Sequence, residues 1–124
     1  MEKESQQIVN RMKIGLIFKA IRTARGLSQV DASLKLGYAN ATFTCMVEKG
    51  GTNIPIDKVM DFATVYGAGE VHVVAAAIMK LIHQDAWKAS GSVFKHYGNI
   101  NTKKIDKDID KWVKDRLDEY GITI

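Results

Sequence analysis

Residues 25–50 read RGLSQVDASLKLGYANATFTCMVEKG, and this stretch decides the fold. Ser28 and Asp31 have the spacing of a capping box, in which the hydroxyl and the carboxylate bond amides that are free at a helix start. The helix that begins there is expected to run to about Leu36, because Gly37 favours a helix end. The first half of the stretch therefore predicts one short helix followed by a tight turn.

A second short helix is expected after this turn. Asn40 is a favourable N-cap residue, and the helix is expected to run from there to about Lys49 before Gly50 and Gly51 break it. Two short helices joined by a turn that contains glycine form the arrangement that lays its second helix in the major groove of DNA. The spacing thus predicts a helix-turn-helix, and more specific residues are needed to support it.

Further helices are expected on both sides of this pair. The preceding helix begins as early as Ser5, and its inner face carries residues spaced three or four apart, namely Ile14, Phe18, Ile21 and Ala24. After the pair, Pro55 suits the first turn of a fourth helix that stops at Gly67. The residues of that helix expected to point inward are Val59, Phe62, Ala63 and Tyr66. A nearly uncharged fifth helix is expected from Gly69 to about Gln84.

Dispersed positions between residues 13 and 68 carry a more specific pattern: Ile14-Gly15, Phe18, Ile21-Arg22, Arg25-Gly26-Leu27-Ser28-Gln29, Leu36-Gly37-Tyr38, Val47-Glu48-Lys49-Gly50, Ile54-Pro55 and Phe62-Ala63-Val65-Tyr66-Gly67. Read together, they resemble the Cro/repressor-like helix-turn-helix family, also called the xenobiotic-response-element family. The resemblance implies an all-α fold: a five-helix lambda-repressor-like domain over residues 1–70, which binds DNA. Residues 71–124 would then be a helical extension that completes the core, dimerises or binds a partner.

Three features depart from the usual family pattern. The turn Gly37-Tyr38-Ala39-Asn40 is one residue longer and resembles the subgroup with a Gly-Tyr-x-Asn turn. Ala32-Ser33 stand where the family usually has Leu-Ala, which is expected to loosen the packing of the second helix. The expected recognition helix, about residues 40–49, contains no arginine and one amide, so bidentate reading of guanine is not expected.

The resemblance also implies which side chains face DNA. Those nearest the bases are Asn40, Ala41, Thr42, Phe43 and Met46. Their methyl and aromatic groups suit thymine methyls, so sites containing A·T pairs are expected, although burial in the core explains Phe43 and Met46 equally well. Gln29 matches the family's phosphate-contacting glutamine, and Lys49 adds attraction that does not depend on sequence. Arg22 and Glu48 are implied to form a partly buried salt bridge that joins the first and third helices.

An apolar stripe follows in the C-terminal part of the chain. It consists of Ile105, Ile109, Trp112, Val113, Leu117 and Tyr120, which share one face of a helix. With Trp87, Phe94 and Tyr97, this stripe either forms a dimer or partner interface or packs on the fifth helix of the same chain. Residues 86–100 contain two glycines and are expected to form a helix broken by loops.

The expected function is sequence-specific binding of double-stranded DNA by a transcriptional regulator of bacterial or phage type, acting as a repressor. A homodimer is expected, because proteins of this kind bind two half-sites about one DNA turn apart. The alternative is an antitoxin or phage regulatory protein whose C-terminal helices bind a partner protein.

Composition agrees with these expectations and excludes other classes. The 124 residues are 46% hydrophobic and 26% charged with a formal net charge of +4, which permits a polyanionic partner. The longest apolar stretch, residues 71–82, is too short to cross a bilayer, and the polar start of the chain lacks a signal-like core, so a cytoplasmic, nucleoid-associated protein without membrane contact is expected. No set of acid, base and nucleophile suggests an enzyme, and no cofactor is expected. A metal site is not expected either, because His72, His83 and His96 lack ligand spacing.

Overall fold

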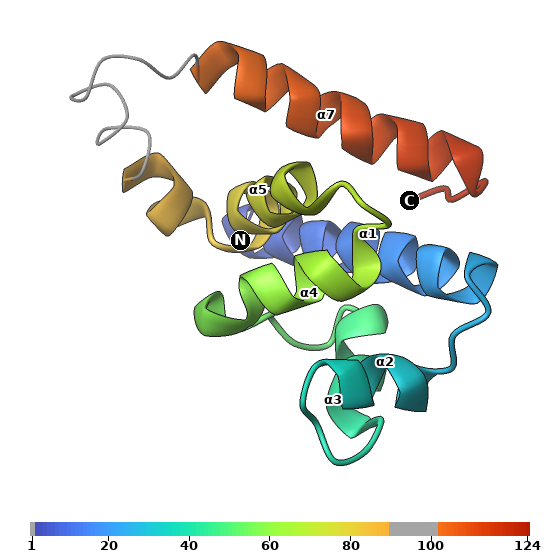
Figure 1. Ribbon diagram of the computed structural model, residues 1–124. Coiled ribbons are helices and arrows are strands. Elements are labelled where there is room, and N and C mark those ends of the chain that lie inside the picture. Colours follow the sequence, from blue (N-terminus) through green and yellow to red (C-terminus); the bar gives the residue numbers. More distant parts are fainter. Residues whose placement is uncertain (1, 90–101) are drawn as a thin grey trace.

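The computed structural model describes residues 2–89 and 102–124, and within these ranges every regular element is helical (Figure 1). The expected all-α fold is therefore confirmed for the described part of the chain. The elements are α1 (Glu2–Ala24), α2 (Gln29–Lys35), α3 (Thr42–Glu48), a 3-10 turn η1 (Ile56–Lys58), α4 (Val59–Tyr66), α5 (Val71–Ile82) and α7 (Thr102–Glu119). Residues 84–89 are also helical, and the remainder of the expected broken helix, with Phe94, His96 and Tyr97, lies outside the described residues.

Helix α1 is longer than expected and forms one wall of the core. It begins at Glu2 rather than at Ser5, and its inner face buries Ile14, Phe18 and Ile21 as predicted. The prediction for Ala24 is wrong, because this residue is exposed. The helix ends at that point and Gly26 turns the chain away with a φ of +73°, so no neighbouring element covers Ala24.

The two short helices form as predicted, with one change at the start of α3. Ser28 Oγ accepts a hydrogen bond from the Asp31 amide at 3.0 Å, and Asp31 accepts one from the Ser28 amide at 3.0 Å, which confirms the capping box. Helix α3 begins at Thr42, and Ala41 rather than Asn40 occupies the N-cap position. Asn40 Oδ1 instead accepts a hydrogen bond from the Thr42 amide at 3.0 Å, the two-residue spacing of an Asx-turn.

The following helices cover α1. Pro55 was expected in the first turn of the fourth helix, but it precedes the 3-10 turn η1, and α4 begins only at Val59. The four residues of α4 expected to point inward are all buried. Helix α5 is shorter than predicted, because the backbone leaves helical geometry at His83, whose Nε2 lies 2.6 Å from the carbonyl oxygen of Ile54. Of the helices in residues 2–89 and 102–124, none combines the length and the apolar character needed to span a membrane.

Helix α7 lies across α5 and also contacts α1, so the buried residues on both sides of residue 70 form one continuous core (Figure 1). Ile109 is fully buried and Trp112 is 4% exposed. These two residues therefore pack within their own chain, so for them the structure favours packing on α5 over the alternative of a dimer or partner interface. The other residues of that predicted interface are partly buried against the same core, namely Ile105, Leu117 and Tyr120.

Candidate functional site

Four helices meet at the carboxylate of Glu48, the last residue of α3. Arg22 of α1 donates to it twice, from Nε at 2.7 Å and from the terminal nitrogen Nη2 at 2.8 Å. The Tyr66 hydroxyl of α4 donates at 2.8 Å, and Gln29 Nε2 of α2 donates at 3.2 Å. The predicted ion pair between Arg22 and Glu48 is therefore present, within a larger network that fixes α3 to the other three helices.

Burial and hydrogen bonding shift the pKa of the Glu48 carboxylate in opposite directions. Burial favours the protonated form of Glu48, but the bonds from Arg22, Tyr66 and Gln29 outweigh it and hold the pKa of Glu48 below its ordinary value. The bond to Glu48 raises the pKa of Arg22, and burial raises the pKa of Tyr66. At neutral pH the network thus holds one guanidinium, one carboxylate and one neutral phenol, an arrangement suited to a rigid joint.

Gly15 allows the end of α3 to approach α1 closely. A methyl group placed on Gly15 would lie 2.5 Å from the carbonyl oxygen of Glu48 and 2.6 Å from that of Val47. Immediately after α3, Arg11 Nε donates to the carbonyl oxygen of Gly50 at 3.1 Å. The end of α3 and the turn that follows it are therefore held against α1 by backbone contact as well as by the Glu48 network.

A buried pair of hydroxyl groups joins α2 to α3. Ser33 and Thr44 have no exposed surface, and Ser33 Oγ donates to Thr44 Oγ1 at 2.5 Å. Ala32 is also fully buried. The expectation that Ala32-Ser33 would loosen the packing is therefore wrong, because Thr44 supplies the partner that the Ser33 hydroxyl needs.

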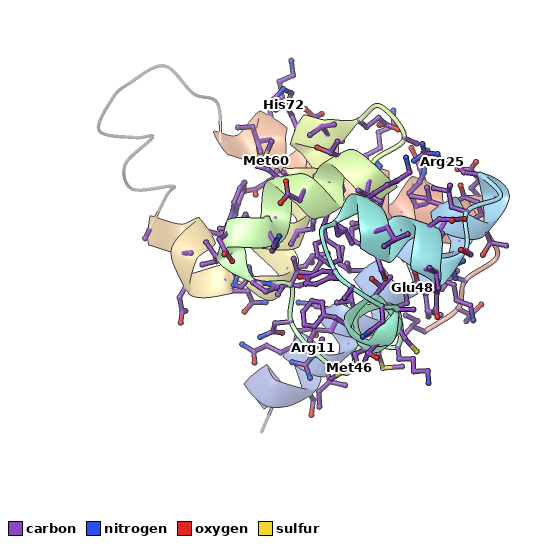
Figure 2. All side chains as sticks on the ribbon, turned by 60° about the horizontal axis from the view of Figure 1, so that its bottom comes forward. Arg11, Arg25, Met46, Glu48, Met60 and His72 are labelled. Atoms are coloured by element: carbon purple, nitrogen blue, oxygen red, sulfur yellow. The ribbon has the colours of Figure 1, made fainter. Side chains whose placement is uncertain are left out.

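The outward face of α3 and the turn before it remain uncovered. Asn40, Thr42 and Lys49 are exposed, Ala41 is partly buried, and Met46 is 44% exposed at the edge of the molecule (Figure 2). The structure thus favours the surface alternative for Met46.

For Phe43 the structure favours the core alternative. Its ring is partly buried and lies 5.0 Å from the ring of Tyr38 and 6.4 Å from that of Phe62, between centroids. The expected contact of Phe43 with thymine methyl groups is therefore not supported, because the ring is used to seat α3 on α4.

Comparisons with protein-family models, with curated proteins and with solved structures find no match to this chain.

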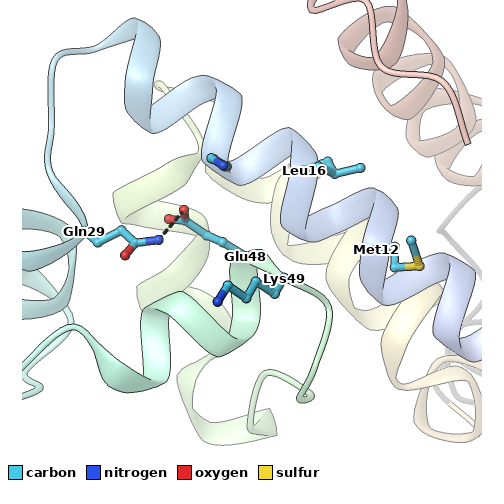
Figure 3. Close-up of a pocket in the computed structure, with 6 residues that line it drawn as sticks. Met12, Leu16, Gln29, Glu48 and Lys49 are labelled. Atoms are coloured by element: carbon cyan, nitrogen blue, oxygen red, sulfur yellow. Dashed lines mark hydrogen bonds between the residues drawn. The ribbon is translucent and has the colours of Figure 1, made fainter.

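A pocket adjoins the Glu48 network on the side of α1. It is lined by Met12, Leu16, Lys19, Gln29, Glu48 and Lys49, and Figure 3 shows the bond from Gln29 to Glu48 at its edge. Sequence reasoning missed this pocket, because it forms only where residues of α1, α2 and the end of α3 meet in the folded chain.

The described residues contain no group of three or more His, Cys, Asp or Glu side chains placed to hold a metal ion. His72 is exposed on α5, and His83 Nε2 lies 2.6 Å from the carbonyl oxygen of Ile54. The uncovered groups on the α3 surface are an amide, a hydroxyl, a thioether and an ammonium, which suit binding by hydrogen bonds, apolar contact and charge.

Proposed function

We propose that α2 and α3 form a helix-turn-helix, that the outer face of α3 binds in the major groove of double-stranded DNA, and that the chain acts as a transcriptional repressor. One observation carries this proposal: the inner face of α3 is fixed through Thr44, Val47 and Glu48, all buried, while its outer face is uncovered. A short rigid helix with one free side is what insertion between two phosphate backbones requires.

The exposed side chains of this region can contact both the base edges and the phosphate backbone of the DNA. The Thr42 hydroxyl and the Asn40 side chain supply hydrogen-bonding groups for base edges or phosphates, and the Thr42 methyl and Met46 supply apolar contact for thymine methyl groups. Because α3 contains no arginine or lysine, direct readout favours sites rich in A·T pairs.

Contacts with the phosphate backbone of the DNA would come from polar residues next to the outer face of α3. Lys49 is exposed directly after α3. Gln29 uses one N–H of its side-chain amide for the bond to Glu48, so its side-chain carbonyl oxygen and second N–H are not part of that bond. The formal net charge of +4 adds attraction that does not depend on sequence.

A two-fold dimer remains part of the proposal, because one helix-turn-helix offers a small interface. The burial of Ile109 and Trp112 means that this dimer would use another surface. The same burial weakens the alternative in which C-terminal helices grip a partner protein, since the centre of their apolar stripe is already covered. Bound to DNA, the protein would be located at the nucleoid.

The test is selection from random double-stranded DNA, followed by affinity measurements at low salt on the parent and on two matched variants. Met46→Glu places a negative charge on the outer face of α3, whereas Met60→Glu places one on α4, where Met60 is 51% exposed and well separated from Met46 (Figure 2). We expect Met46→Glu to weaken binding by at least about tenfold and Met60→Glu to change it far less. Failure of the parent to retain any duplex in dilute salt, or equal losses in both variants, would refute the proposal.

A further inference from the structure

An apolar stripe on the outer side of α1 is left uncovered by the fold. Ile8 is 47% exposed and Met12 is 38% exposed, and Leu16, one turn further on, is partly buried. Residues four apart lie on the same side of a helix, so these three form one continuous surface. The proposed contact with DNA, through the outer face of α3, gives this surface no role.

The stripe leads into the pocket lined by Met12, Leu16, Lys19, Gln29, Glu48 and Lys49 (Figure 3). The pocket has a volume of about 170 Å³. An apolar cavity of about 150 Å³ is large enough to hold benzene, so this pocket can receive one leucine or phenylalanine side chain. Its size suits a single anchoring side chain better than a large organic ligand.

The charges around the pocket are unbalanced. Lys19 and Lys49 are exposed, and neither ammonium group has an ion-pair partner among the side chains that the structure describes, those of residues 5–89 and 104–124. The one acidic residue among those lining the pocket is Glu48, whose side chain is 1% exposed and already neutralised by Arg22. The surface therefore combines an apolar floor with positive charge at its rim.

We propose that this surface, formed by Ile8, Met12, Leu16, Lys19 and Lys49, binds an acidic amphipathic helix of a partner protein. One apolar side chain of that helix enters the pocket, a second packs one turn away on Met12 and Ile8, and flanking carboxylates meet Lys19 and Lys49. A second copy of this chain fits poorly, because a two-fold contact would bring the same basic rim against itself. Phosphate groups alone would leave the apolar stripe unused.

Such a partner would also affect DNA binding. It would cover Lys49 and adjoin Gln29, the two residues to which the proposed function gives phosphate contacts. We therefore expect the partner helix and DNA to compete, and this consequence alone rests on the proposed function.

The test uses the full chain and three labelled synthetic peptides, followed by fluorescence anisotropy in the absence of DNA. The first peptide has leucines at helical spacing with glutamates elsewhere, the second has the same residues in scrambled order, and the third has lysines in place of the glutamates. We expect the first peptide to bind more tightly than either control by at least about tenfold, and its affinity to fall as salt is added. Equal binding of all three peptides, or no binding of the first at about 1 mM, would overturn the proposal.

Two further variants locate the site on the protein. Lys19→Glu reverses one rim charge, and Met12→Gln removes apolar contact from the floor. Both are expected to weaken binding of the acidic peptide by about tenfold, whereas Met60→Gln on α4 leaves it unchanged. Melting curves for each variant separate a loss of binding from a loss of folding, and a folded Lys19→Glu variant with unchanged affinity would exclude this surface. Because these measurements contain no DNA, their outcome is independent of whether the chain binds a duplex.

Discussion

Gly15 and Glu48 lie so close together that α1 and the end of α3 are in backbone contact. The absence of a side chain at Gly15 leaves room for the Glu48 carbonyl oxygen, which a methyl group there would approach to 2.5 Å. The same residue of α3 uses its carboxylate to bind α1, α2 and α4. Glu48 therefore fixes the end of α3 to three other helices, while Thr42, at the start of α3, stays exposed.

Gly15→Ala is expected to destabilise the protein despite the higher helix propensity of alanine. Propensity favours the change by up to about 1 kcal/mol, but the added methyl group must displace backbone atoms of α3, for a net loss of about 1–2 kcal/mol in the free energy of unfolding. Gly51→Ala is the matched control, since a methyl group there would lie 3.6 Å from its nearest neighbour, an ordinary contact. Urea denaturation measures both, and a Gly15→Ala variant as stable as the control would contradict the close approach.

The lowered pKa of Glu48 predicts a specific dependence of stability on pH. A carboxylate whose pKa is lower in the folded state stabilises the fold fully above its ordinary pKa of 4.5, and this contribution disappears as the pH falls through the lowered value. We expect Glu48→Gln to be less stable than the parent by about 3 kcal/mol at neutral pH, because it leaves the Arg22 guanidinium buried without its charge partner.

The difference in the free energy of unfolding between the parent and Glu48→Gln is expected to become smaller at about pH 3, where a carboxyl group of ordinary pKa is protonated. Denaturation at several pH values measures this change. A difference that is the same at neutral and acidic pH would show that the charge of Glu48 does not stabilise the contacts of α3 with α1, α2 and α4.

Helix positions were predictable where a few residues determine a boundary locally. Ser28, Asp31 and Gly37 specify the start and the end of α2 through side-chain capping and a positive φ. At Asn40 the same reasoning fails by one residue, because a side-chain oxygen that caps a helix also forms an Asx-turn. The ion pair of Arg22 with Glu48 was implied by the family resemblance and not by helical spacing.

The direction in which side chains point was less predictable. Helix α3 has 7 residues, too few for apolar periodicity to distinguish the inward Phe43 from the outward Met46. The stripe on α7 was recognisable, but its spacing is the same whether it meets α5 or another molecule. Met12 on α1 is an apolar residue that lies two positions before the buried Ile14, off the buried face of the helix, and the fold leaves it 38% exposed.

The packing of α7 on α5 predicts a large cost for truncating Ile109. This side chain is fully buried, so Ile109→Ala removes apolar contact and leaves a cavity, for an expected loss of about 2–5 kcal/mol. Ile56, which is 57% exposed, is the matched control, and Ile56→Ala is expected to change stability by no more than about 0.5 kcal/mol. Equal effects in the two variants, measured by thermal and urea denaturation, would mean that α7 does not complete the core in solution.

The buried bond between Ser33 and Thr44 predicts non-additive mutations. Thr44→Val keeps the shape of the side chain but leaves the Ser33 hydroxyl buried without a partner, which costs about 1–3 kcal/mol, and Ser33→Ala strands Thr44 in the same way. The double variant removes both hydroxyls together, so we expect it to be no less stable than the worse single variant. A double-mutant cycle measured by urea denaturation gives the coupling, and strictly additive losses would show that the two hydroxyls do not stabilise the contact between α2 and α3 as a pair.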